Sequence, residues 1–145
     1  MSAHARRSAH ASWQGTVAEG GGRIGLESGA YEGPFTLKAR MDDVESATNP
    51  EELIAAAAAG CFTMSLASLL EEQGTPAADI QTKARVRLEQ QPEGFRITRI
   101  TLQTVGDAPG VDAARFTELA EQAKATCPVS LALAGTEVVL DAALK

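Results

Sequence analysis

The chain has 145 residues, which is enough for one domain with a hydrophobic core. Hydrophobic residues make up 44% and charged residues 22%, values typical of globular proteins. The formal net charge of −6 argues against nonspecific nucleic-acid binding, because such binding depends on basic side chains that displace phosphate counterions. We therefore expect a single domain over residues 1–145, with residues 1–10 flexible and no nucleic-acid partner.

Two segments indicate in which cellular compartment the protein is expected: the N-terminal residues and the longest apolar stretch. Residues 1–13 lack the apolar segment of a signal peptide. Residues 53–70 are long enough for a membrane span, but polar residues interrupt them, glutamates flank them and the rest of the chain can cover them. We expect a cytoplasmic protein with no membrane partner, in which two cysteines are reactive or simply buried rather than structurally bridged.

Alternating segments in the first third of the chain predict three strands. Residues 11–15 and 23–28 are expected to be short strands, with a turn at the consecutive glycines between them. Residues 34–41 alternate apolar and polar side chains, which predicts a third strand with Arg40 on its polar face. Residues 42–48 are expected to form a polar loop.

The next segment carries the signals of a long helix. Asn49 is a favourable N-cap, Pro50 suits the first helical position, and Glu52 stands three residues after Asn49 as in a capping box. Gly74 is a typical residue for the end of a helix. Because the helix is apolar nearly all round, we expect it to be central and buried. Phe62 and Met64 are expected in its core packing, with a pocket-lining role as the alternative.

The remaining residues predict a hairpin, two helices and a last strand. The expected elements are strands over 80–90 and 95–105, a helix capped by Asp112 and ended by Cys127 and Pro128, a helix over 129–134 and a strand over 137–141. A register slip is expected near Thr98 and Arg99. The order βββ-α-ββ-αα-β predicts an α+β fold of mostly antiparallel sheets packed on the buried central helix.

The two cysteines are too far apart in sequence for a CxxC redox or zinc-ribbon motif. Cys127 stands at a predicted helix start, where free N–H groups lower the pKa of a thiol. Cys61 lies mid-helix and would need a cation from elsewhere to become a nucleophile. Free cysteines are often buried and inert, so the residues alone do not decide between a reactive pair and two inert thiols. His4 and His10 lie in the polar N-terminal stretch, which argues against a catalytic histidine or a histidine metal site.

Three segments together resemble the OsmC/Ohr family of thiol-dependent peroxidases, and its OsmC branch more closely. They are ATNPEELIAAAAAGCFTMSL at 47–66, KATCPVSLAL at 124–133, and the β-rich opening with GRIGLESGAY and FTLKARM. The resemblance implies an intertwined homodimer with two active sites at its interface, reducing organic hydroperoxides, and hydrogen peroxide less well, in oxidative or osmotic stress. It also implies no metal or bound organic cofactor, and an external dithiol reductant, often lipoyl groups on a carrier protein.

The resemblance also implies roles for particular residues. By motif match, Cys61 resembles the peroxidatic cysteine and Cys127 the resolving cysteine, which would form a disulfide with the Cys61 sulfenic acid. Glu51 matches the active-site glutamate. Two arginines match the active-site arginine: Arg40 as in the OsmC branch, which we favour, and Arg23 in a GGR segment as in the Ohr branch.

Helical spacing adds an expectation about the dimer. Glu51 and Cys61 lie ten residues apart on the predicted helix, or about 15 Å along its axis. We therefore expect Glu51 to serve Cys61 of the other subunit, with the central helices antiparallel across a two-fold axis. The alternative function is a noncatalytic dimeric binding or interaction protein with inert cysteines. A thiol hydrolase or transferase is a third possibility, against which the lack of a core histidine argues.

Overall fold

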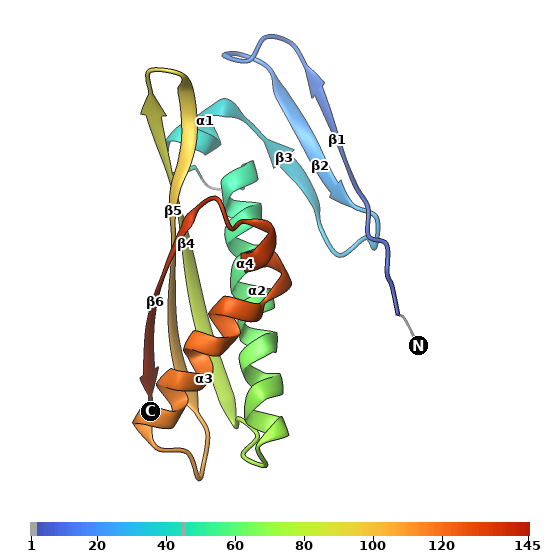
Figure 1. The fold of residues 1–145 in the computed structure, drawn as a ribbon. Helices are drawn as coiled ribbons and strands as arrows, with labels where there is room; N and C mark the ends of the chain where they lie inside the picture. The colour runs from blue at the N-terminus through green and yellow to red at the C-terminus, as the bar shows by residue number, and fades with distance from the viewer. Residues whose placement is uncertain (1–2, 45) are drawn as a thin grey trace. The chain divides into compact units, whose positions relative to one another are not determined.

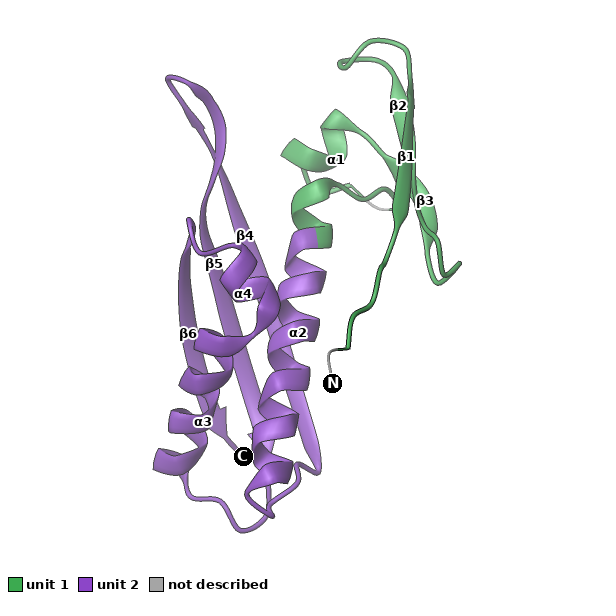
Figure 2. Ribbon diagram, turned by 45° about the vertical axis from the view of Figure 1, so that its right-hand side comes forward, with its two compact units in different colours: residues 1–53 green, residues 54–145 purple. Residues whose placement is uncertain are grey.

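The structure is a computed structural model that describes residues 3–44 and 46–145. The elements of this part of the chain, shown in Figure 1, are β1 (Ala9–Gln14), β2 (Gly21–Leu26), β3 (Glu32–Phe35), α1 (Leu37–Met41), α2 (Pro50–Glu72), β4 (Asp79–Gln91), β5 (Gly94–Asp107), α3 (Ala113–Thr126), α4 (Pro128–Ala132) and β6 (Glu137–Leu144). The α+β class is confirmed. The elements divide into two compact units, residues 1–53 and residues 54–145, coloured separately in Figure 2.

Unit 1 contains an antiparallel sheet in the order β1-β2-β3. Its first two strands start about two residues earlier than predicted, because Gly21 and Gly22 pair within β2 and the turn lies before them. Gly22 has a packing role, since a Cβ there would lie 2.4 Å from the ring of Phe35. Of the N-terminal residues expected to be flexible, Ala9 and His10 belong to β1, and residues 1 and 2 lie outside the described part.

The strand predicted over residues 34–41 is wrong. β3 ends at Phe35, and α1 follows at once, so Arg40 lies on a helix. The Thr36 side chain caps α1 by accepting a hydrogen bond from the N–H of Ala39, 3.0 Å away. A period of two cannot be separated from a single helical turn over so few residues, and the cap at Thr36 decides in favour of the helix.

α2 begins and ends as predicted, although its capping box is incomplete. The Asn49 side chain accepts from the N–H of Glu52 at 2.8 Å and donates to the carbonyl of Ala39 at 2.8 Å. The Glu52 carboxylate accepts from the Thr48 hydroxyl at 2.7 Å, in place of the N-cap N–H that a capping box would use. At the other end, Gly74 adopts φ of 84°, the left-handed conformation typical of a helix stop. Asn49 thereby joins the start of α2 to α1.

Unit 2 contains a second sheet in the order β4-β5-β6. β4 and β5 are antiparallel, and the slip expected near Thr98 is confirmed: Arg87 pairs with Arg99 and Leu88 with Ile97, so Thr98 has no partner on β4. β6 pairs in parallel with β5 and extends to Leu144, beyond the predicted end at residue 141.

The core of unit 2 lies between this sheet and two helices. Figure 1 shows α3 and the unit 2 part of α2 on the same face of the sheet. The helices contribute buried side chains at helical spacing over the central strand β5: Ala58, Phe62, Leu66 and Leu70 from α2, and Phe116, Leu119, Ala120 and Ala123 from α3. The apolar stripe predicted after Asp112 is confirmed, as is the Asp112 cap, which accepts from the N–H of Arg115.

Within unit 2, the sheet and the other helices cover only one face of α2. In its most apolar 18-residue window, 22% of the residues are buried, and by length and composition alone the helix could cross a membrane. Ala57 and Gly60 are exposed on the uncovered face, together with Met64, which is 76% exposed. The prediction of a helix buried all round therefore does not hold within unit 2, where one face of α2 is left uncovered.

Candidate active site

Unit 2 brings the two cysteines into direct contact. Cys61 lies on α2, half-buried, and Cys127 lies fully buried where α3 ends and α4 begins. Both are free thiols, and their Sγ atoms are 2.7 Å apart in a hydrogen bond. Pro128 stops α3 because it has no N–H to continue it, which leaves Cys127 at the junction. The fold therefore places side by side two thiols that are distant in sequence.

The surroundings of the two thiols shift their pKa values in opposite directions. Burial raises the pKa of Cys61, and its hydrogen bond to Cys127 raises it further. Burial acts on Cys127 in the same direction, but hydrogen bonds from Cys61 and from Ser130 and Val129 outweigh it and lower the Cys127 pKa. Either thiol can donate in the sulfur–sulfur contact. The donors at the start of α4 therefore place the Cys127 pKa below the Cys61 pKa within this chain.

Unit 1 holds a partly buried ion pair between two of the expected site residues, in which Glu51 is buried and the Arg40 side chain is 38% exposed. Glu51 lies in the first turn of α2 and is 7% exposed. Its Oε1 accepts from Arg40 Nε at 2.8 Å and from Nη2 at 2.5 Å. The other carboxylate oxygen, Oε2, is buried without a hydrogen-bond partner in the described residues. A buried unpaired acceptor is costly, so Oε2 is a natural site for an incoming donor.

Arg23, the alternative to Arg40, has different surroundings. It lies on β2, where its Nε is 3.4 Å from Glu32 Oε1. Both side chains are more than half exposed, at 57% and 59%. An ion pair so exposed to solvent contributes little free energy. The structure therefore pairs Arg40, and not Arg23, with the buried glutamate.

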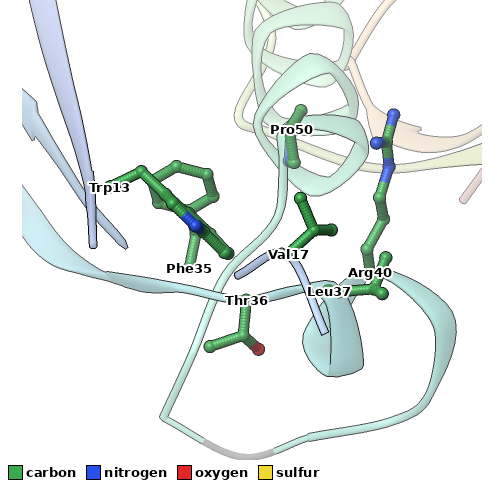
Figure 3. Close-up of a pocket in the computed structure, with 7 residues that line it drawn as sticks. All are labelled: Trp13, Val17, Phe35, Thr36, Leu37, Arg40 and Pro50. Carbon is green, nitrogen blue, oxygen red and sulfur yellow. The ribbon is translucent and has the colours of Figure 1, made fainter. Parts of the chain in front are cut away.

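A cavity of about 170 Å³ lies beside Arg40 in unit 1. Its lining, drawn in Figure 3, is Trp13, Val17, Phe35, Thr36, Leu37, Arg40 and Pro50. Trp13 and Phe35 pack edge to face, with ring centroids 5.3 Å apart. The walls are mostly apolar and Arg40 is the only charged residue of the lining. The cavity therefore suits a small molecule with an apolar body and a polar end.

The sequence reasoning missed these aromatic walls. Phe62, expected in the core or in a pocket, is fully buried in the core of unit 2, as predicted, whereas Met64 is exposed. Trp13 is the only tryptophan of the chain, and in a chain with 4% aromatics it was a usable signal. Its meeting with Phe35 depends on the pairing of β1, β2 and β3, which composition does not reveal.

The described part of the chain holds no group of three or more His, Cys, Asp or Glu side chains able to bind a metal ion. The candidate groups are the two thiols of unit 2 and, separately, the guanidinium and carboxylate of the ion pair in unit 1. These groups suit nucleophilic chemistry at sulfur and stabilisation of a developing anion.

Comparison with known proteins identifies the family. The OsmC-like protein family matches residues 42–141, which include Glu51 and both cysteines. The chain belongs to this family. It is 41% identical to peroxiredoxin OsmC of Escherichia coli, over 100% of this chain and 99% of that protein. It is 34% identical to the organic hydroperoxide resistance protein OhrA of Bacillus subtilis, over 72% of this chain and 73% of that one.

A solved structure supports the same assignment. The organic hydroperoxide resistance protein OhrB of Bacillus subtilis is 27% identical and superposes with a TM-score of 0.67, covering 95% of this chain and 98% of that one. The OsmC/Ohr resemblance read from the sequence is thus confirmed. Between the two named relatives, identity is higher to OsmC than to OhrA, in agreement with the expected branch.

The thiol contact predicts opposite pKa shifts when either cysteine is removed. In Cys127→Ala, Cys61 loses the sulfur that holds its proton, so its pKa falls and its alkylation by iodoacetamide begins at lower pH. In Cys61→Ala, Cys127 loses a donor, so its pKa rises. Peptide mapping of reduced protein alkylated across a pH series measures both. Shifts in the same direction would show that the sulfurs do not share a proton.

Proposed function

We propose that this thiol-dependent peroxidase reduces organic hydroperoxides, and hydrogen peroxide less well, with Cys61 as the attacking thiolate and Cys127 as the resolving thiol. The observation that carries the proposal is the 2.7 Å contact between the two sulfurs, which lets one thiol capture the oxidised form of the other. Cys61 is the more accessible of the two, as the attacking residue must be. The names of the OsmC and OhrA relatives support peroxide as the substrate.

The proposed reaction uses one peroxide and two thiols. The Cys61 thiolate attacks the terminal peroxide oxygen, the O–O bond breaks, and Cys61 becomes a sulfenic acid while the departing oxygen takes a proton and leaves as alcohol or water. Cys127 then attacks the Cys61 sulfur and displaces the hydroxyl group as water, which forms a disulfide. An external dithiol, such as a lipoyl group on a carrier protein, restores both thiols by exchange.

Arg40 and Glu51 are the proposed partners of the attacking thiol. A guanidinium beside a thiol favours the thiolate, and it also stabilises the negative charge on the departing oxygen. Glu51 holds the fork of Arg40 through Oε1. The unpaired Oε2 is free to accept a hydrogen bond from the O–H of the peroxide. The apolar cavity beside Arg40 would receive the organic group.

The spacing along α2 supports a site shared between two subunits. Glu51 and Cys61 are ten residues apart on one continuous helix, about 15 Å of rise. Glu51 is therefore proposed to act on Cys61 of the partner subunit, in an intertwined homodimer with antiparallel central helices. The uncovered apolar face of α2 supports this, because Ala57 and Gly60 allow a second helix to approach closely. A cytoplasmic location and a role in oxidative or osmotic stress stay predictions.

Replacing the attacking sulfur tests the reaction. Wild-type protein treated with cumene hydroperoxide is expected to lose both thiols rapidly and to form one disulfide per chain, measured by thiol titration and by mass. Cys61→Ser is expected to have no turnover, and Cys127→Ser to form a sulfenic acid without a disulfide. Full peroxidase activity in Cys61→Ser would refute the mechanism, and inert thiols in the wild type would favour the noncatalytic alternative.

The two arginines are separated by matched substitutions. Arg40→Ala is expected to lower kcat/KM for cumene hydroperoxide by about 100-fold or more, because it removes the cation that stabilises both thiolate and departing oxygen. Arg40→Lys restores only part of the activity, since an ammonium lacks the planar fork. Arg23→Ala changes kcat/KM by less than about twofold, as its exposed ion pair contributes little. The reverse ranking of the two alanine variants would assign the role to Arg23.

Hybrid dimers test whether the site is shared. Chains carrying Cys61→Ser and chains carrying Glu51→Gln are produced together with different tags, and the hybrid is purified on both tags. If Glu51 acts on the partner subunit, one site of each hybrid has both substitutions and the other has none, so activity is about half that of the wild type. Hybrids as inactive as the parent variants would place Glu51 and Cys61 of one site in the same chain.

A further inference from the structure

Three threonine hydroxyls form a row across unit 2. Thr63 on α2 contacts Thr82 on β4, with their Oγ1 atoms 2.8 Å apart. Thr82 contacts Thr104 on β5, with Oγ1 atoms 3.0 Å apart. Thr63 also donates to the main-chain carbonyl of Ala59, one turn earlier on α2, at 2.7 Å. The row therefore ties the helix that carries Cys61 to two strands of the sheet.

The hydroxyls of the row depend on one another for donors and acceptors. The Thr63 hydroxyl has one proton and two acceptors within reach, the Ala59 carbonyl and Thr82 Oγ1. In the contact between Thr82 and Thr104, either hydroxyl can donate. Removing any one hydroxyl leaves at least one contact without a donor or an acceptor.

The hydroxyl row occupies inward-facing positions of β4 and β5 whose neighbouring pairs are apolar. Thr104 is 1% exposed and faces Thr82 in the register of β4 and β5. The next inward-facing pair is Ala84 with Leu102, and the one after is Val86 with Ile100. Valine has nearly the shape of threonine, and replacing both partners of a buried hydrogen bond by apolar groups costs little stability. Overall stability therefore does not require hydroxyls here, and polar contacts of this kind can instead fix one orientation of the packed elements.

The orientation that the row fixes is the rotation of α2. Cys61 and Thr63 are two residues apart, so their side chains point about 200° from each other around the helix axis. Thr63 meets β4, and Cys61 meets Cys127 on the other side. A side-chain tip lies about 5 to 6 Å from the axis, so a rotation of about 10° would move the Cys61 sulfur by about 1 Å. Disulfide geometry tolerates little error of that kind.

We propose that the row of Thr63, Thr82 and Thr104 is a positioning device for the resolving step: it sets the rotation of α2 so that the oxidised Cys61 sulfur stays within reach of Cys127. This inference rests on the proposed roles of the two cysteines. In that step the Cys127 sulfur bonds to the Cys61 sulfur, the S–O bond of the sulfenic acid breaks, and the hydroxyl group leaves as water. A sulfenic acid out of reach of Cys127 meets more peroxide and becomes a sulfinic acid.

Paired double variants separate orientation from stability. Thr82→Val with Thr104→Val removes both strand hydroxyls together, so neither is left unpaired, while Thr63 keeps its bond to Ala59. The melting temperature is expected to equal or exceed that of the wild type. The ratio of sulfinic acid to disulfide at Cys61, measured by mass after excess cumene hydroperoxide, is expected to rise about tenfold, since misplacement by about 1 Å costs up to about 100-fold in rate.

The matched control is Thr82→Ser with Thr104→Ser, which keeps the hydroxyls and is expected to keep the wild-type ratio. Thr63→Val and Thr63→Ser form a second pair that tests the row from the helix side should the double valine variant fail to fold. A wild-type ratio in a folded valine variant overturns the inference while leaving the peroxidase mechanism standing. A wild-type protein that forms no Cys61–Cys127 disulfide overturns both.

Discussion

An α-helix advances by a fixed rise per residue, and this constraint governs how the candidate site can be assembled. α2 carries Glu51 in its first turn and Cys61 near its middle. It is also the element of the described chain that belongs to both compact units. The ion pair of Glu51 with Arg40 lies in unit 1, and the thiol pair lies in unit 2. No bending of a regular helix brings its own Glu51 to its own Cys61.

The two units differ in how completely their inward-facing polar groups are hydrogen-bonded. In unit 2 the hydroxyls of Thr63, Thr82 and Thr104 satisfy one another, which makes that part of the core specific in orientation. In unit 1 the Glu51 carboxylate has one oxygen with two donors and one with none. A satisfied hydrogen-bond network keeps its side chains in one arrangement, whereas an unsatisfied acceptor can take a hydrogen bond from a ligand. The first suits the placement of sulfur, and the second suits the reception of peroxide.

Local signals predicted the elements whose ends are decided by neighbouring residues. Asn49, Gly74 and Asp112 act within one or two turns of their own helix, so their side chains or backbone preferences suffice to locate it. The strand predicted over 34–41 was wrong because a local signal of the same kind was overlooked: the Thr36 side chain caps a helix, and α1 begins at the next residue. A five-residue helix has too few positions to show a period.

The remaining features depend on contacts between distant segments. Trp13 meets Phe35 only through the register of three strands, and the threonine row needs the register of β4 and β5 together with the rotation of α2. Neither leaves a periodic signal in the sequence. Family motifs predicted the cysteines and Glu51 as site residues, and the proposal of Arg40 over Arg23 depends on the position of Glu51 in space.

The parallel pairing of β5 with β6 has a consequence for how the protein is made. A parallel neighbour requires a long crossover, and here α3, Cys127 and α4 form that crossover. The crossover is closed only when the last strand of the chain joins the sheet. During synthesis, Cys61 leaves the ribosome more than sixty residues ahead of Cys127 and before any strand of the unit 2 sheet. The contact between the two thiols therefore cannot form until the crossover has been made, and the last strand of the chain completes the sheet beneath it.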